Sequence, residues 1–229
     1  MVDFSSIKSI EIPEGKVKSI TRNGTTLWKA SGLPSEYQQV EWIKSTGTQY
    51  LDSGISCANG IKCQYKALFN SYGYLCGAHG LSSPYGRCGA YVHSDRKFEF
   101  GYGDTYNKAG TANLNILYEV EYKTTYNDAY LKVKGGIYND WTQIYTASYQ
   151  TVTTANAMIF SQQYAITHGE PKTQAILYYL KIYDSNDVLQ GDFVPCYRKS
   201  DDVIGLYNLV NNTFITNLGT GTLEKGGDV

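Results

Sequence analysis

The sequence has little charge and none of the features that mark several broad classes of function. Charged residues make up 18% of the 229 residues, and the formal net charge is −1; an average globular protein has roughly 25% charged residues. No long basic run is present, so the electrostatic signature of nucleic-acid binding is missing. No apolar stretch approaches the ~20 residues that a membrane-spanning helix needs. We therefore expect neither nucleic acid nor a membrane span.

A secretory signal is also missing from the first residues, MVDFSSIKSIEIPEG, which have no basic segment followed by an apolar segment. This pattern predicts synthesis in a cytoplasm without a signal peptide. A protein of this kind that works outside the cell is expected to leave by lysis or as part of a particle.

Spacings typical of metal ligands are absent. The five cysteines, Cys57, Cys63, Cys76, Cys88 and Cys196, form no CxxC or Cys/His pattern. Free, mostly buried thiols are expected. A disulfide between Cys57 and Cys63, or between Cys76 and Cys88, stays open because spacing alone does not decide it. No cofactor is predicted; calcium is left open, but nothing in the sequence indicates it.

Catalytic motifs are missing as well. The three histidines, His79, His93 and His168, lie outside any HExxH motif and away from a serine or cysteine nucleophile signature. Glycine-rich segments lie between predicted strands and not at helix starts, which argues against a phosphate-binding loop. We therefore predict no catalytic residues and a protein that is not an enzyme.

Tyrosine, in contrast, is abundant, with 22 residues, and apolar residues alternate with polar ones along most of the chain. No segment shows a helical period, and short alternating segments separated by turns predict an all-β fold, a β-sandwich. The alternating rows run over residues Ile61–Phe69, Cys88–Val92, Phe98–Tyr102, Ile116–Tyr122, Ala129–Val133 and Ile176–Ile182.

The composition divides the chain into three parts. Residues 1–30 are predicted to form a small β-hairpin module, because Asn23-Gly24 is a strong signal for a type I′ turn that pairs Arg22 with Thr25 and Ile20 with Leu27. A lone hairpin is marginally stable, so this module is expected to pack on the main domain or on a partner chain. Residues 31–36 form a linker, and residues 37–229 form the main sandwich.

Two segments of the main domain are interpreted as loop-rich, Asn70–Asp95 and Lys134–Gln150, with glycine turns around Gly73, Gly77 and Gly80. They combine aromatic and polar side chains, which is the mixture that recognises sugar rings, and binding residues often lie on loops. Solvated connections without a ligand are the alternative. The ligand-binding candidates are Tyr72, Tyr74, His79, Tyr85, Arg87 and Trp141.

The C-terminal stretch predicts a long strand, a polar turn, a second strand and a tight hairpin. Asn211-Asn212 is a candidate two-residue turn that pairs Leu209 with Phe214 and Val210 with Thr213. This pairing is expected to close the sandwich.

The same stretch, KIYDSNDVLQGDFVPCYRKSDDVIGLYNLVNNTFITNLGTGTLEKG, resembles a repeated ending in proteins of prophages and gut Firmicutes. LPSEYQQVEWIKSTGTQYLDSGI resembles the usual start of the same domain. The whole looks like a concanavalin A-like jelly-roll sandwich of the laminin G/pentraxin type. Asn208 stands where this family often has Asp, which puts any metal or salt-bridge role of the position in doubt.

The resemblance implies a phage tail protein that is made in the bacterial cytoplasm, exposed extracellularly on the virion, and binds host cell-surface glycans. The hairpin ending in TLWK is similar to short modules of virion proteins, which implies contacts with other tail proteins through residues 1–30. A homo-oligomer is expected. The alternatives are a structural virion decoration or assembly protein without a ligand, and a divergent glycoside hydrolase.

A retaining hydrolase needs two carboxylates about 5–5.5 Å apart. In laminarinase-type members of this fold they come from an ExDxxE strand, since alternate positions share one sheet face. The sequence has no such motif. The nearest candidates are Asp95 with Glu99, and Glu119 with Glu121; the second pair, next to Lys123, is predicted to lie on a solvated sheet face.

Overall fold

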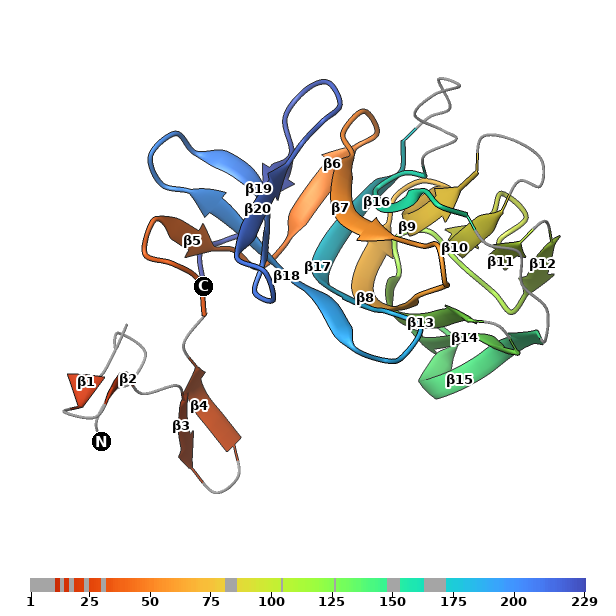
Figure 1. The fold of residues 1–229 in the computed structure, drawn as a ribbon, viewed down its shortest axis with the longest axis horizontal. Coiled ribbons are helices and arrows are strands. Elements are labelled where there is room, and N and C mark those ends of the chain that lie inside the picture. Colours follow the sequence, from red (N-terminus) through yellow and green to blue (C-terminus); the bar gives the residue numbers. More distant parts are fainter. Residues whose placement is uncertain are drawn as a thin grey trace. The chain divides into compact units, whose positions relative to one another are not determined.

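A computed structural model shows strands and turns, with no helix in the part of the chain that it describes. That part comprises residues 11–12, 15–16, 19–22, 25–29, 32–80, 86–103, 105–125, 127–147, 153–162 and 172–229. The chain divides into two compact units, Met1–Pro34 and Ser35–Val229, which Figure 1 draws together and which are considered separately below.

The first unit contains two short antiparallel pairs, β1 (Glu11–Ile12) with β2 (Gly15–Lys16), and β3 (Ser19–Arg22) with β4 (Thr25–Lys29). Arg22 is opposite Thr25, as predicted. Ile20, however, is opposite Trp28 and not Leu27, because the register shifts by one residue between Ile20 and Thr21. The predicted turn at residues 23–24 lies outside the described residues.

The second unit contains two large sheets. One is a six-stranded antiparallel sheet in the order β12-β11-β10-β9-β16-β7. Its strands are β7 (Leu51–Ser56), β9 (Gly73–His79), β10 (Arg87–Val92), β11 (Phe98–Gly103), β12 (Thr105–Ala109) and β16 (Asn156–Ile159).

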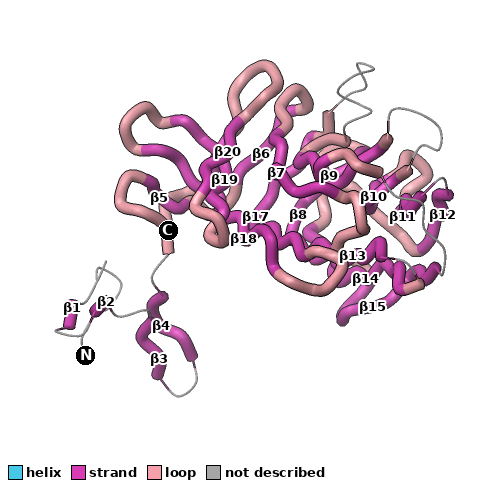
Figure 2. The backbone as a smooth tube through the Cα atoms, viewed as in Figure 1, coloured by secondary structure: helices cyan, strands magenta, loops and turns pink. Residues whose placement is uncertain are grey.

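The other is an eleven-stranded sheet with the path β15-β14-β13-β8-β17-β18-β19-β20, to which β5, β6 and β21 are added (Figure 2). Its strands are β5 (Tyr37–Gln39), β6 (Ile43–Thr46), β8 (Lys62–Phe69), β13 (Leu117–Thr125), β14 (Asp128–Gly135), β15 (Tyr138–Ala147), β17 (Gln174–Tyr183), β18 (Leu189–Arg198), β19 (Val203–Asn208), β20 (Thr213–Thr216) and β21 (Glu224–Lys225).

The core lies between the two sheets. Every second residue of β8, from Cys63 to Phe69, is fully buried, and the inward row of β10 from Cys88 to Val92 belongs to the same apolar cluster. The hydroxyl of Tyr122 on β13 donates to the carbonyl of Cys76 on β9 at 3.0 Å, so the two sheets are also joined by a hydrogen bond. The predicted all-β sandwich is confirmed.

The predicted inward row from Ile176 to Ile182 is wrong in its first half. The register of β17 on β8 shifts between Leu177 and Tyr179, which inserts one extra residue. Because side chains alternate with a period of two, this bulge reverses the faces on either side of it. Ala175 and Leu177 are therefore buried in the core, and Ile176 and Tyr178 are half-buried on the opposite face.

The C-terminal hairpin has a wider turn than predicted. Tyr207 is opposite Phe214 and Asn208 is opposite Thr213, so residues 209–212 form the turn and the predicted pairing of Leu209 with Phe214 is wrong. The physical reason is the backbone bond from the amide of Asn212, which has a positive φ of 59°, to the carbonyl of Asn208 at 2.9 Å. A four-residue turn satisfies this bond, whereas a two-residue turn does not.

Asn208 itself is fully buried and makes three hydrogen bonds with its side chain. Its Oδ1 accepts from the backbone amides of Asp192 and Val210 at 3.0 Å each, and its Nδ2 donates to the carbonyl of Gln190 at 3.2 Å. The amide thus ties β18 to the end of β19. A carboxylate could make the first two bonds but has no proton to donate to the Gln190 carbonyl.

We predict that Asn208→Ala lowers the free energy of unfolding by roughly 2–4 kcal/mol, because it empties the buried position of the Asn208 side chain and removes its hydrogen bonds to two backbone amides and one carbonyl. Urea denaturation followed by tyrosine fluorescence measures the change. The matched control is Asn186→Ala in the exposed β17–β18 turn, where a change within about 0.5 kcal/mol is expected. Equal stability of the two variants would contradict the role assigned to Asn208.

Candidate functional site

Three of the six predicted ligand-binding residues lie next to one another. Tyr74 and His79 are on β9, and Arg87 is on β10, directly opposite His79. The core residues of these strands, such as Ala78 and Cys88, point toward the eleven-stranded sheet. Because successive side chains alternate across a sheet, His79 and Arg87 lie on the face turned away from the core. Tyr74 lies on the same face because the register of β9 on β10 shifts between Gly89 and Tyr91, which inserts one extra residue into β9 between Tyr74 and Gly77. We call this the outer face of the six-stranded sheet.

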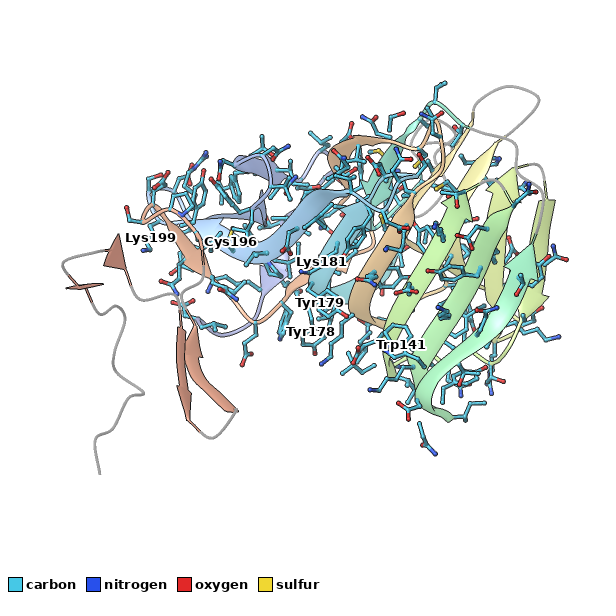
Figure 3. All side chains as sticks on the ribbon, turned by 60° about the horizontal axis from the view of Figure 1, so that its bottom comes forward. Trp141, Tyr178, Tyr179, Lys181, Cys196 and Lys199 are labelled. Atoms are coloured by element: carbon cyan, nitrogen blue, oxygen red, sulfur yellow. The ribbon has the colours of Figure 1, made fainter. Side chains whose placement is uncertain are left out.

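The other three candidates do not join this group. Trp141 is on β15 of the eleven-stranded sheet (Figure 3), with 42% of its surface exposed. Tyr72, which is 38% exposed, lies in the turn before β9. Tyr85 lies outside the described residues. The interpretation of residues 70–95 and 134–150 as loop-rich is only partly correct, because β9 and β10 occupy half of the first segment and β14 and β15 occupy most of the second.

A row of three glycines crosses the outer face. It explains why glycines within these strands were interpreted as turn residues. Gly77, Gly89 and Gly101 are opposite one another on β9, β10 and β11. A Cβ atom at Gly77 or Gly89 would lie 3.1 Å from Cδ1 of Tyr74, and one at Gly101 would lie 3.3 Å from the Tyr74 hydroxyl. The Tyr74 ring therefore lies flat on backbone that carries no side chains. Gly77 and Gly89 serve this close approach in the middle of strands and do not form turns.

Tyr74 is the centre of the group. It is only 7% exposed although it does not belong to the core cluster between the sheets. Its ring centroid is 4.9 Å from that of Tyr91, which is opposite it on β10. Burial raises the pKa of the Tyr74 hydroxyl well above its usual range; the charge of Glu99 raises it further, and that of Arg87 opposes the shift. At neutral pH this hydroxyl is protonated and able to donate a hydrogen bond.

The sequence interpretation missed Tyr91. It recognised Cys88, Ala90 and Val92 as an inward row, and the alternation then places Arg87 and Tyr91 together on the opposite face. The alternation of β10 therefore contains the signal for Tyr91, whereas the mixture of residue types in the supposed loops does not. Glu99, which lies opposite Tyr91 on β11, is found by the same alternation.

The aromatic surface continues from Tyr91 to His93, whose ring centroids are 5.8 Å apart. His93 and Lys108 each lie 3.1 Å from the carboxylate of Asp95. Partial burial acts to raise the pKa of Asp95, but hydrogen bonds from Lys108 and His93 outweigh it and hold this pKa below its usual range. The outer face thus combines aromatic rings with side chains of both charges, which suits recognition of a polar ring compound.

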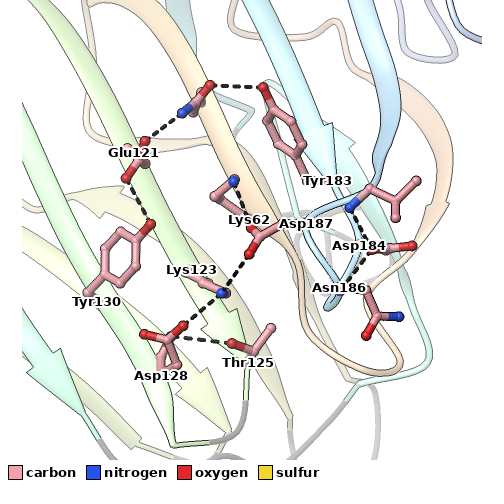
Figure 4. A network of polar contacts seen from close by, with 12 residues as sticks. Lys62, Glu121, Lys123, Thr125, Asp128, Tyr130, Tyr183, Asp184, Asn186 and Asp187 are labelled. Atoms are coloured by element: carbon pink, nitrogen blue, oxygen red, sulfur yellow. Dashed lines mark hydrogen bonds and ion pairs between the residues drawn. The ribbon is translucent and has the colours of Figure 1, made fainter.

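The second pair of carboxylates considered for hydrolysis lies on the outer face of the eleven-stranded sheet. Glu121 accepts hydrogen bonds from Gln64 and, at 2.8 Å, from the hydroxyl of Tyr130 (Figure 4). Its carboxylate is also 3.5 Å from the ammonium group of Lys132. Its side chain is 16% exposed. Burial acts to raise the pKa of Glu121, but these three partners lower it. A carboxylate held ionised in this way is a poor proton donor at neutral pH.

Glu119 and Glu121 lie on an outer sheet face, as predicted. The prediction that solvent surrounds this face is wrong, because ion pairs cover part of it. Lys123 is buried, and its ammonium group lies 2.7 Å from Asp128 and 3.2 Å from Asp187. Lys62 reaches the other oxygen of Asp187 at 2.6 Å. These ion pairs connect the β17–β18 turn to β8, β13 and β14 and account for the burial of Lys123 (Figure 4).

No three histidine, cysteine, aspartate or glutamate side chains in the described ranges are grouped so that they could hold a metal ion. Within the same ranges, no helix is long and apolar enough to cross a membrane.

Among the comparisons with known proteins, only the one with solved structures found matches. No family model matches the sequence, and no curated protein matches it. Ten chains of solved structures match. One is the crystal structure of a xylan β-1,4-xylosidase from Bacillus halodurans C-125, with 12% identity and a TM-score of 0.33. The match covers 55% of this chain and 28% of the xylosidase chain. A similarity this low carries no argument about activity or substrate.

The glycine row generates a test of the outer face. We predict that Gly89→Ala lowers the free energy of unfolding by about 2–3 kcal/mol, because the new methyl group would lie 3.0 Å from the Cys76 carbonyl and 3.1 Å from the Tyr74 ring, at a φ of +151°. Chemical denaturation measures this. Gly227→Ala, where no atom lies closer than 3.7 Å, is the control and should change stability by less than about 0.5 kcal/mol.

The Glu121 contacts generate a second test. Since the pKa of folded Glu121 lies below its ordinary value of 4.5, its contribution to stability is present above that value and is lost as the pH falls through the folded pKa. Glu121→Gln should therefore cost about 1–2 kcal/mol at pH 7, and the difference from the wild type should shrink below pH 4.5. Urea denaturation at several pH values measures it.

Glu119→Gln is the matched control on the same strand and face, since the Glu119 carboxylate makes no hydrogen bond or ion pair with a described residue. A smaller loss of stability at pH 7 is expected there. A Glu121→Gln effect that stays constant between pH 7 and pH 3 would contradict the charge-based explanation.

Proposed function

We propose that this chain is a non-enzymatic carbohydrate-binding protein, a concanavalin A-like jelly-roll sandwich of the laminin G/pentraxin type that binds polysaccharide of a bacterial host surface. The proposed binding site is the outer face of the six-stranded sheet. It is formed by Tyr74, His79, Arg87, Tyr91 and Glu99, with His93, Asp95 and Lys108 extending it.

The observation that carries the proposal is the assembly of these residues on one sheet face. Tyr91 presents a half-buried ring beside the buried ring of Tyr74, and an aromatic face of this kind stacks on the apolar side of a sugar. Arg87 and Glu99 flank the rings on neighbouring strands. Charged groups with several donors and acceptors read sugar hydroxyls. The arrangement supplies stacking and polar recognition together.

The proposed setting is a phage tail, with the protein exposed outside the cell on the virion. Its support is the resemblance of the two ends of the main domain to prophage proteins. In this setting the N-terminal module, residues 1–30, attaches the sandwich to other tail proteins, and several copies present their sandwiches together. Many weak sites then act as one strong attachment through avidity.

The function is tested by titrating the full chain against an array of bacterial cell-wall and capsular polysaccharides. We expect binding to at least one of them. Tyr91→Ala and Arg87→Ala should each weaken it about tenfold or more, since each removes about 1.4 kcal/mol or more of contact. Trp141→Ala is the control. Trp141 was a candidate from the sequence, but it lies on β15 of the other sheet. Its replacement should therefore leave the affinity for polysaccharide unchanged.

Silence of the whole array would favour the alternative of a decoration or assembly protein without a ligand. Release of reducing sugar from a bound polysaccharide would favour a divergent hydrolase. This conclusion requires that the Glu99→Gln variant no longer releases reducing sugar. Loss of binding in Trp141→Ala with full binding in Arg87→Ala would move the site to the eleven-stranded sheet.

A further inference from the structure

Tyr74 carries a polar group that has no partner within the described ranges. Its side chain is only 7% exposed, and its backbone carbonyl accepts a hydrogen bond from the Thr173 hydroxyl at 2.6 Å. The Tyr74 hydroxyl, in contrast, makes no hydrogen bond with a described residue. Because a buried hydroxyl without a partner costs free energy, an unsatisfied group of this kind in a candidate binding site points to a partner in the ligand.

The hydroxyl lies beside the glycine of β11. A Cβ atom at Gly101 would be 3.3 Å from the Tyr74 hydroxyl, and 3.3 and 3.4 Å from Cβ and Cδ of Arg87. Since Gly101 has no side chain, the hydroxyl of Tyr74 and the methylene groups of Arg87 line the outer face at this point. A hydrogen-bond donor and an apolar stem therefore lie next to each other.

A hydrogen-bond acceptor follows on the same strand. Glu99 and Gly101 are two residues apart on β11, so they share the outer face and their Cα atoms are roughly 7 Å apart. Lys108 is opposite Glu99 but pairs with Asp95. The half-buried Glu99 carboxylate makes no hydrogen bond or ion pair with a described residue. It therefore adds an acceptor to the donor at Gly101.

The spacing of this donor and acceptor fits an amide group. In a trans amide the oxygen and the N–H point in opposite directions, so their hydrogen-bond partners lie roughly 7–8 Å apart. A hydroxyl group donates and accepts at one atom, and its two partners lie no more than roughly 6 Å apart. A carboxylate on the ligand would be repelled by Glu99, and an ammonium group cannot accept from Tyr74.

We propose that the outer face of the six-stranded sheet recognises the acetamido group of N-acetylated amino sugars, an assignment that rests on the carbohydrate-binding function proposed above. The Tyr74 hydroxyl donates to the acetamido carbonyl, and the Glu99 carboxylate accepts from the acetamido N–H. The acetyl methyl group packs on the methylene groups of Arg87. The sugar ring stacks on Tyr91, which lies opposite both Tyr74 and Glu99.

The test titrates the full chain with three β-1,4-linked tetrasaccharides, made of N-acetylglucosamine, of glucosamine and of glucose, and follows binding by isothermal titration calorimetry. The three probes differ only in the substituent at C2. We expect the acetylated probe to bind about tenfold more tightly than either of the others, which is the effect of one or two hydrogen bonds. Equal, weaker or undetectable binding of the acetylated probe would overturn the inference.

The variant Tyr74→Phe removes the hydroxyl and keeps the ring. Its affinity for the acetylated tetrasaccharide should fall about tenfold, and its binding of the glucose tetrasaccharide should stay as in the wild type. Because the hydroxyl makes no hydrogen bond with a described residue, the melting temperature should not fall. A clear fall in the melting temperature would assign the hydroxyl to the fold and would overturn the inference.

The acceptor is tested at Glu99. Glu99→Ala should lose the preference for the acetylated probe, whereas Glu99→Gln keeps an acceptor oxygen and should retain it. Tyr178→Phe is the control for the loss of a tyrosine hydroxyl, since Tyr178 is on β17 of the other sheet (Figure 3). This control should bind all probes as the wild type does. An unchanged preference in Glu99→Ala would contradict the role of Glu99.

The polysaccharide array separates this inference from the proposed function. If the array contains a bound polysaccharide but the tetrasaccharides show no preference for the acetylated form, the acetamido assignment is wrong and the binding function stands. If the array and all tetrasaccharides show no binding, both are wrong.

Discussion

The face-to-face packing of two antiparallel sheets is the constraint on which the rest of this structure depends. Each strand contributes alternate residues to one apolar core, and the core accepts large rings such as Tyr65, Tyr118 and Tyr122 without loss of alternation. Fully burying an apolar side chain such as Phe69 contributes about 1.5–3 kcal/mol. The other residues of each strand point away from the core. They form the outer faces of the two sheets, and these two faces differ in chemistry.

The outer face of the eleven-stranded sheet is organised by ion pairs and hydrogen bonds. The charged groups of Lys123, Asp187 and Glu121 form ion pairs or hydrogen bonds with other side chains of this face. These contacts stabilise the structure of the sheet. The outer face of the six-stranded sheet is organised by rings. Three glycines let the Tyr74 ring rest on the backbone, and Tyr91 and Arg87 are held beside it. The second arrangement combines aromatic rings with charged side chains on one sheet face, which is why the binding proposal is placed there.

Alternation explains both the successes and the errors of prediction. The buried rows of β8, β10 and β13 were found because their pattern is continuous. The error in β17 arose at a single inserted residue, Tyr178, which reverses the faces. Glycine was interpreted as a turn residue at Gly77, where it serves a ring packed on a strand. The residues next to a glycine in the sequence do not show whether it forms a turn or accommodates a ring. At Gly77, Gly89 and Gly101 the ring belongs to Tyr74, which lies at the start of β9 and is not a sequence neighbour of these glycines.

The sequence by itself determined the all-β class and the inward rows of β8, β10 and β13, because a period of two is a local property of the chain. Tyr74, His79 and Arg87 were candidates because of their residue types, not because of this period. Only the tertiary structure decided that Trp141 belongs to the other sheet and that Tyr91 stands beside Tyr74. These are contacts between distant strands, and strand order and register depend on the packing of the whole domain.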